Sequence, residues 1–447
     1  MNLASIALVS VIAGTVALSS GCVSPRNDVS QISTELEQRN GHSVTNTKPG
    51  EVTWPSTLSF EDGLSEDEAV TLALWNNAAF QETLADIGLS RAELMQAGIF
   101  PNPTLSMLVP LGAKGLELTA KYPLEALWLR PKRVGAAKRS YEQTVQRLTQ
   151  AALDLIRDAK LSFADAVLMQ ERVRSAEQTV AVTANIGQLS KARLDAGDAS
   201  ELELSTARVD GLQAEELLAR ARQDLRIASE RLRASLGMSL RPFPQNIVES
   251  QPPTVAPDMT LLVTNALAAR PDLRAAQLGI ESAGKRIGLA RLEAFTLAAG
   301  VNAKDVNGAF LAGPSLDFAV PIMNQNQGGI ALAKANFEKA ARRYYTVRDK
   351  IVLEVRESHL RFSQALESFD KWQEQILPPL EAAVRQAQKA YEVGEASLLL
   401  VLDNTRHLED VRAKAAGARA DMHRAAAELE RSVGGRLQPS SVGTTNP

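Results

Sequence analysis

Apolar residues recur along this chain with two different spacings. Long stretches place them at helical intervals, and shorter segments between these stretches alternate apolar and polar residues. No proline occurs between Lys132 and Arg241, and the window 322–438 contains only the adjacent pair at 378–379. Because proline ends a helix at or just before itself, both windows are predicted to hold long helices, and a helix filling 132–192 would measure about 90 Å.

A heptad can be traced from Val145 along the first of these stretches. Alanine and serine in its seam let helix axes approach closely, which favours a sheet-like array of helices. A dry two-stranded coiled coil is the alternative. The a positions are Val145, Ala152, Ala159, Ala166, Val173 and Val180, and the d positions are Leu148, Leu155, Ser162, Met169, Ala176 and Thr183.

Two segments between the helical stretches have a period of two and predict β-hairpins. The loops expected within these hairpins are 110–115 and 305–313, and each hairpin closes at a proline, Pro123 or Pro321. In the first hairpin, 104–109 precedes Leu116, Leu118, Ala120 and Tyr122, which alternate with Glu117, Thr119 and Lys121. In the second, 296–304 precedes Leu316, Phe318 and Val320, which alternate with Ser315 and Asp317.

Four strands with one apolar and one polar face cannot bury that apolar face alone. They are also too few to close a membrane barrel, and an open sheet edge cannot face lipid. A barrel assembled from several chains satisfies both constraints, with the apolar face toward lipid and Glu117, Lys121 and Asp317 toward the lumen. The alternative is a small soluble sheet that caps the helices.

The helical stretches contain one glycine break each, at Gly197 and Gly394, followed by Ser200 and Ser397. Glycine can end a helix in the left-handed conformation, and serine can cap the next helix, so each break predicts a helical hairpin. A glycine tolerated within a helix, at a cost of about 1 kcal/mol, is the alternative. The breaks belong to a duplicated unit near 195 residues, since "LALWNNAAF" at 72–80 aligns with "NALAARPDL" at 265–273.

The N-terminus predicts export. An apolar run at 3–18 is too short to span a membrane and is followed by "SSGC", which resembles a lipobox ending at Cys22, the only cysteine. A plain secretory signal with an incidental cysteine is the alternative. The predicted domains are a signal peptide at 1–21, a lipidated tether at 22–59, repeats at 60–240 and 258–436, a linker at 241–257 and a tail at 437–447.

Composition narrows the possible functions. Aromatic residues make up only 4% of the chain, which is typical of a thin helical molecule, and a net charge of −3 gives no field that would attract nucleic acid. The four histidines are scattered, and the phosphate-loop, zinc-protease and nucleophile-elbow motifs do not occur. We therefore expect neither an enzyme nor a bound metal or cofactor.

The chain resembles the outer-membrane efflux protein family, the TolC-like outer membrane factors, over about 60–436. The most specific segments are "ALAARPDLRAA" at 266–276, "ILPPLEAAVRQAQKAYEVGEASLLLVLDNTRHLED" at 376–410 and "AAAELERSVGG" at 425–435. The resemblance implies a mainly α fold with a small β part. Three chains would form a helical tunnel through the periplasm and share a barrel of twelve strands in the Gram-negative outer membrane.

The same resemblance implies partners and a gate. The partners are a periplasmic adaptor protein, an inner-membrane pump of the RND type and outer-membrane lipid. The turns at Gly197, Ser200, Gly394 and Ser397 would lie at the periplasmic tip, and Glu203 and Asp403 would face the lumen as rings of three acids, whereas Leu400 occupies a place that is often acidic. Such rings attract cations and obstruct anions. The alternative is a solvated face that helps the first helical turn.

The function expected from these features is passive exit of drugs or heavy-metal cations delivered by the pump. Two alternatives stay open, namely an exit duct for type I secretion and a structural periplasmic coiled-coil lipoprotein without a channel.

Overall fold

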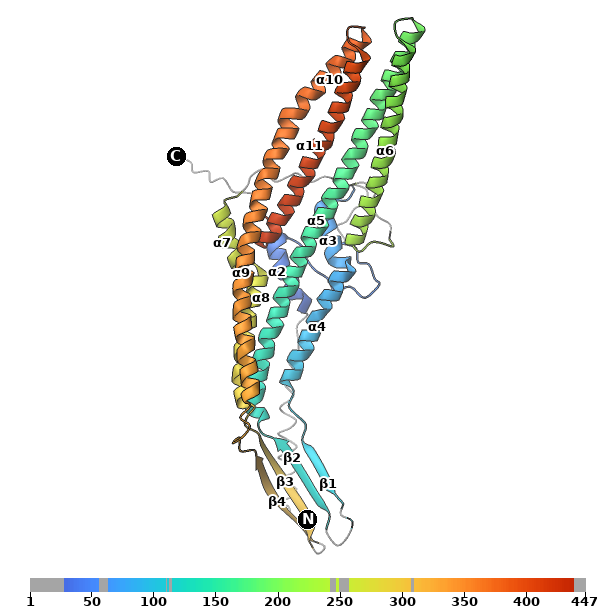
Figure 1. Cartoon of the computed structure of the whole chain (residues 1–447). Helices are drawn as coiled ribbons and strands as arrows, with labels where there is room; N and C mark the ends of the chain where they lie inside the picture. The colour runs from blue at the N-terminus through green and yellow to red at the C-terminus, as the bar shows by residue number, and fades with distance from the viewer. Residues whose placement is uncertain are drawn as a thin grey trace, which may run out of the picture. The chain divides into compact units, whose positions relative to one another are not determined.

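The computed structural model describes residues 28–55, 63–109, 111, 115–241, 247–248, 257–306 and 309–437 (Figure 1). Cys22 and most of the predicted linker lie outside these residues. The helices are α2 (Asp28–Asn40), α3 (Glu66–Asn76), α4 (Ala78–Gly98), α5 (Ala126–Asp195), α6 (Glu201–Ser235), α7 (Met259–Ala269), α8 (Pro271–Leu292), α9 (Gln327–Asp370), α10 (Leu377–Glu392) and α11 (Leu398–Val433), with a π-helical turn η1 (Lys371–Ile376). The strands are β1 (Thr104–Leu108), β2 (Glu117–Pro123), β3 (Leu297–Val306) and β4 (Ala309–Phe318).

The predicted fold class is confirmed, because the described chain is mainly helical and carries one four-stranded sheet. Among the described residues, no helix combines the length and the hydropathy that crossing a membrane would require. The elements fall into two compact units. One gathers the sheet with the helical segments within 85–145 and 275–344, and the other gathers the helices of 32–84, 146–274 and the chain from Tyr345 onward.

The duplication predicted from the sequence recurs in the order of the elements. Helices α3 and α7 each have 11 residues and are capped by side chains at matching positions, Ser65 and Asp258. The helices after the two glycine breaks, α6 and α11, have 35 and 36 residues. The copies differ before the breaks, because α5 is continuous over 70 residues, whereas its counterpart is divided into α9, η1 and α10.

The sheet has the order β1-β2-β3-β4 and is antiparallel throughout. One of its faces is polar and carries two ion pairs between strands. Glu117 Oε1 lies 2.5 Å from Lys304 Nζ, and Lys121 Nζ lies 3.0 Å from Asp317 Oδ2. The second pair reaches across β3 at Gly300, which has no side chain to separate the two ends.

The opposite face of the sheet is apolar and is left exposed by the residues that the structure describes. Leu105 on β1 is 77% exposed, and further large apolar side chains of this face are more than half exposed. The strands β1 and β4 also leave one edge each without a partner within the described residues. The sheet is therefore incomplete as a folding unit. The exposed apolar side chains of this face include Leu105, Met107, Phe310, Leu316 and Phe318.

The loop predicted at 305–313 is wrong, because β3 and β4 continue until only two residues separate them. The sequence interpretation took Gly308 and Gly313 as loop residues, whereas Gly313 lies within β4. Pro314 lies inside β4, as a proline can on a strand at the edge of a sheet.

Helix α5 begins at Ala126, six residues before the predicted start, and includes Pro131. The proline removes one hydrogen bond near the start of the helix, a loss that packing along the rest of the helix outweighs. The predicted seam is buried at Ala152, Ala159 and Ala166. The buried face is wider than that seam and also includes Leu153, Ile156, Phe163 and Leu168, which argues against a lone two-stranded coiled coil.

The predicted tether at 22–59 is wrong for residues 28–55. Ile32 and Leu36 on α2 are fully buried, the Glu35 carboxylate accepts a hydrogen bond of 3.0 Å from Gln146 Nε2, and Arg39 Nη1 donates to the carbonyl of Ala269 over 2.5 Å. On α2 itself only two apolar residues are buried, which is too few to produce a detectable helical period in the sequence. The segment is part of the folded unit.

The segment "ARPDL" at 269–273 supplies two members of an ion network, Arg270 and Asp272. The Arg270 side chain is 1% exposed, and its guanidinium contacts Asp272 and Glu354 at 2.6 Å each and the carbonyl of Ser432 at 3.1 Å. Arg431 lies 2.9 Å from Glu354 and 2.8 Å from Asp154. Burial alone would raise the pKa of Glu354, but the two guanidinium groups outweigh that effect and lower it. The network joins α5, α8, α9 and α11.

We expect Glu354→Gln to destabilise this unit by about 2–3 kcal/mol, because it removes a charged acceptor shared by the buried Arg270 and the partly buried Arg431. The midpoint of thermal unfolding measures the effect. Glu338→Gln is the matched control, since Glu338 forms an exposed i,i+4 pair with Arg342 that contributes at most about 0.5 kcal/mol. Equal shifts for the two variants would contradict a structural role for the network.

The effect of Glu354→Gln should depend on pH. A carboxylate whose pKa is lowered by folding stabilises the folded state above its unfolded pKa, near 4.5, and this stabilisation is lost as the pH falls through the folded pKa. The stability difference between the native protein and Glu354→Gln should therefore be largest near pH 7 and shrink below about pH 4.5. A difference that stays constant down to pH 3 would exclude the ionised carboxylate as its cause.

Candidate functional site at the two helical turns

The two glycine breaks form the same turn. Gly197 and Gly394 have φ values of +85° and +79°. In the first turn the Asp198 amide donates to the carbonyl of Arg193 over 2.8 Å, and in the second the Glu395 amide donates to the carbonyl of Ala390 over 2.8 Å. Together with the bonds from the glycine amides, this pattern is the Schellman motif, which requires a left-handed residue.

Each turn leads into a helix capped by serine. Ser200 Oγ accepts the amide hydrogen of Glu203 at 3.2 Å, and Ser397 Oγ accepts that of Leu400 at 3.4 Å. Figure 1 shows the resulting hairpins, α5 with α6 and α10 with α11. The alternative, a glycine tolerated within a continuous helix, is therefore wrong at both positions, because each glycine lies between two helices.

The two acids expected at the gate do not occupy equivalent places after their turns. Glu203 is the third residue after its cap serine, whereas Asp403 is the sixth. The residue equivalent to Glu203 in the second turn is Leu400, which is apolar and exposed. The Asp403 side chain is exposed to solvent. The acids therefore have different surroundings.

Glu203 takes part in a hydrogen-bonded chain centred on Tyr391, a residue that the sequence analysis did not single out. Tyr391 is 1% exposed, and its hydroxyl donates to Glu203 Oε1 over 2.7 Å and lies 3.0 Å from Ser190 Oγ. The Arg193 guanidinium stacks over the tyrosine ring at 4.8 Å and lies 3.9 Å from the Glu203 carboxylate. Burial and the bond to Glu203 raise the pKa of Tyr391, so the hydroxyl remains a donor at neutral pH.

This tyrosine tie, formed by Ser190, Arg193, Glu203 and Tyr391, joins both hairpins near their turns. Ser190 and Arg193 are on α5, Glu203 is on α6, and Tyr391 is on α10. A small apolar cluster surrounds the tyrosine ring and excludes water from its bonds, which strengthens them. The other buried members of this cluster are Ile186, Ala207, Leu398, Val401 and Leu402.

A second contact joins the hairpins further from the turns. The Arg406 guanidinium on α11 contacts the carboxylate of Asp210 on α6, and this aspartate is buried. Both ties must break if the hairpins are to separate. Neither was predicted from the sequence, because the partners are almost 200 residues apart.

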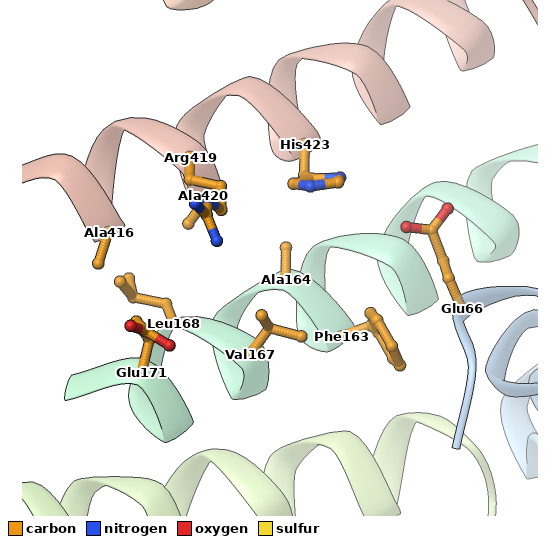
Figure 2. Close-up of a pocket in the computed structure, with 10 residues that line it drawn as sticks. All are labelled: Glu66, Phe163, Ala164, Val167, Leu168, Glu171, Ala416, Arg419, Ala420 and His423. Carbon is orange, nitrogen blue, oxygen red and sulfur yellow. The ribbon is translucent and has the colours of Figure 1, made fainter. Parts of the chain in front are cut away.

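Two cavities lie among the helices that carry the turns. The cavity in Figure 2, between α5 and α11, has a volume of about 20 Å³, room for a single water molecule. Its lining is largely apolar and includes Phe163, Val167, Leu168, Ala416 and Ala420. Among the described residues of one chain, no group of three or more His, Cys, Asp or Glu side chains gathers to hold a metal.

A larger open cleft of about 730 Å³ lies between the two hairpins. Its walls are charged on both sides, with Arg172, Arg220 and Asp224 from one hairpin and Glu409 and Arg412 from the other. Burial raises the pKa of Glu409. The cleft is therefore lined by charges of both signs.

The comparisons with known proteins agree with this architecture. The family model for the outer membrane efflux protein matches residues 69–238 and 262–435, one match in each copy of the duplication. The cobalt-zinc-cadmium resistance protein CzcC of Cupriavidus metallidurans is 25% identical over 402 residues, which cover 88% of this chain and 94% of the relative. The toluene efflux pump outer membrane protein TtgF of Pseudomonas putida is 25% identical over 310 residues, which cover 63% of each protein.

Solved structures with the same fold include CusC, described in connection with transmembrane channel formation, with a TM-score of 0.70 at 19% identity over 88% of this chain and 99% of that one. The outer membrane channel CmeC of Campylobacter jejuni has a TM-score of 0.68 at 16% identity over 88% of this chain and 92% of that one. The chain belongs to the outer membrane efflux protein family and is an outer-membrane channel component of that kind.

We expect Tyr391→Phe to weaken the link between the two hairpins, because it removes the hydroxyl and keeps the ring. A hydrogen bond to a charged acceptor contributes about 1.5–3 kcal/mol, so the ratio of open to closed channels should rise about tenfold or more. Single-channel recordings in planar bilayers measure this ratio. Tyr345→Phe, at an exposed tyrosine, is the control. Equal open probabilities for both variants would rule out the tie as a restraint on opening.

Proposed function

We propose that this outer-membrane efflux protein is the exit duct for divalent metal cations, delivered from an inner-membrane pump of the RND type through a periplasmic adaptor. We choose metal cations as the cargo because the chain is similar to the cobalt-zinc-cadmium resistance protein over 94% of that relative. The relatives named for organic compounds match over shorter parts of this chain, 73% for a pyoverdine export protein and 63% for the toluene pump component.

The duct is a homotrimer. The apolar sheet face and the two open strand edges of one chain support this proposal, because lipid cannot accept an unpaired edge and four strands cannot close upon themselves. Three chains supply twelve strands, whose apolar faces would all contact lipid. The ion-paired polar face, with Glu117, Lys121, Lys304 and Asp317, then lines the lumen.

The turns form the periplasmic end of the duct, and the tyrosine tie and the Arg406–Asp210 pair restrain its opening. Asp403 acts as a ring of three exposed carboxylates in the lumen, while Glu203 acts mainly through its bond to Tyr391. A ring of this kind attracts cations and disfavours anions.

The tips of the hairpins supply the surface for the adaptor. Leu202 and Leu399 occupy the same position after their cap serines and are 76% and 72% exposed, and Val393 beside the second glycine is also exposed. Isolated exposed leucines are common, but a repeated pair at two matching turns supports a docking surface for apolar side chains of a partner.

Cys22 adds a lipid anchor at the outer membrane. The supporting observation is the apolar run at 3–18 followed by small residues and this single cysteine. The lipid would add to the attachment that the shared barrel provides.

Deletion of this gene from its host should sensitise the cells to Zn²⁺, Co²⁺ or Cd²⁺ and leave tolerance to antibiotics unchanged. Growth inhibition across a panel of metal salts and antibiotics measures the outcome, with a strain complemented by the native gene as the reference. Sensitivity to antibiotics alone would replace the metal cargo by organic compounds. Loss of a secreted polypeptide without either sensitivity would favour a secretion duct.

Leu316→Arg should prevent assembly in the membrane. An arginine on the lipid-facing side of a barrel costs about 2–4 kcal/mol near the middle of the bilayer, and three chains would each bear that cost. Heat-labile trimers extracted from outer membranes, separated on gels, measure the result. Ser315→Arg, one residue earlier and on the polar face, is the matched control. Normal trimers with Leu316→Arg would contradict the assignment of this face to lipid.

A further inference from the structure

One face of α11 is left uncovered by the other residues that the structure describes. Its opposite face packs into the unit through Leu402, Thr405 and Leu408, all of which are buried. The uncovered face carries Asp403 and His407, both exposed. Neither side chain has a hydrogen-bond or ion-pair partner among the described residues, which distinguishes them from Asp410, whose carboxylate pairs with Lys414 at 2.6 Å.

Asp403 and His407 are four residues apart, so their side chains lie one above the other on the same side of the helix. The same spacing lets two side chains of one helix bind a single zinc ion in the HExxH motif. Imidazole nitrogen combined with carboxylate oxygen suits borderline divalent cations such as Zn²⁺, Co²⁺ and Ni²⁺, whereas carboxylates alone suit Mg²⁺ and Ca²⁺. The pair therefore has the composition of a transition-metal site with two ligands.

Two ligands from one chain are too few to hold such an ion, and the described residues of one chain offer no third. Rotation about a threefold axis brings the pair from each of three chains to the same depth and supplies up to six ligands. We infer that Asp403 and His407 of the three chains together form a binding site for transition-metal divalent cations where the duct narrows. This inference rests on the proposed trimer with the uncovered face of α11 toward its lumen.

A site in a duct must also release its cargo. Conduction requires binding that is strong enough to admit the ion and weak enough to let it leave. The exposure of both side chains and the absence of hydrogen bonds that orient the imidazole are consistent with weak binding, because metal ligands in tight sites are held by such bonds. The site would favour transition metals over Mg²⁺ at the entrance of the duct without trapping them.

The test is block of the open duct by Zn²⁺. Full-length trimers in planar bilayers are titrated with zinc chloride, and the concentration that halves the conductance is measured for the native protein, His407→Gln and Asp403→Asn. Both variants should require at least about tenfold more Zn²⁺, since even groups that only orient a metal ligand contribute 10–100-fold to affinity. Asp198→Asn, at an exposed acid in the first turn, is the control and should behave as the native protein does.

The outcomes separate this inference from the proposed function. If Asp403→Asn relieves the block and His407→Gln does not, the acidic ring stands and the mixed metal site is overturned. If neither variant changes the block in a conducting trimer, both the site and the ring at Asp403 are overturned, whereas the duct itself remains. Absence of trimers for the native chain would overturn the proposed function and the site with it.

A spectroscopic measurement checks the ligands directly. Trimers in detergent, titrated with Co²⁺, should show visible absorption bands that change when His407 is replaced by Gln, because the bands report on the nitrogen and oxygen atoms around the ion. Mg²⁺ in large excess should not displace the Co²⁺. Identical spectra for the native protein and His407→Gln would exclude the imidazole as a ligand.

Discussion

The exposed apolar face of the four-stranded sheet is the constraint on which the rest of this structure depends. Burial of apolar surface is the main force that stabilises a fold, yet residues such as Leu105 and Phe318 stay exposed among the described residues of their unit. Two unpaired strand edges add polar groups that need partners. In the proposed trimer, lipid would cover the apolar face and strands of neighbouring chains would pair with both edges, so that assembly would complete the fold.

The duplication gives the chain two similar hairpins, and differences between the copies give the hairpins their link. Tyr391 corresponds in the first copy to Leu194, and Glu203 corresponds in the second to Leu400, when the cap serines are superposed. Each copy therefore holds one half of the hydrogen bond that joins them. If the two hairpins were identical, any tyrosine–glutamate bond between them would occur twice or not at all. The single bond therefore depends on the difference between the copies.

The sequence was sufficient for features that depend on neighbouring residues. The turns followed from a glycine and a serine three residues later, and the two hairpins of the sheet followed from alternation along each strand. Tyr391 and Arg270 were visible in the sequence, but their roles depend on partners such as Glu203 and Glu354, which the fold brings from far along the chain. No local pattern distinguishes a tyrosine that bonds such a partner from one that only fills space.

The wrong predictions for α2 and β4 also arose because contacts between distant parts of the chain are not visible in a local sequence pattern. Helix α2 was taken for a tether because its apolar contribution to the core is only Ile32 and Leu36, and contacts from other helices, such as the bond of Arg39 to Ala269, also hold it. The strand β4 was predicted too short because glycine and proline weaken a strand locally, whereas pairing with β3 over ten residues fixes it. In both cases, contacts across the fold outweighed weak local preferences.

Helix α11 contributes both to the packing around the tyrosine tie and to the proposed cation site. Its buried face includes Val401 and Leu402, which pack in the cluster around Tyr391, and its uncovered face carries Asp403 and His407. A movement of α11 that breaks the tie must therefore also move the proposed cation ligands. Because coupling between two equilibria is reciprocal, an ion that binds better when three α11 helices are close would stabilise the closed arrangement to the same extent that closure strengthens its binding. The tie would then set how tightly the cargo is held as well as when it leaves.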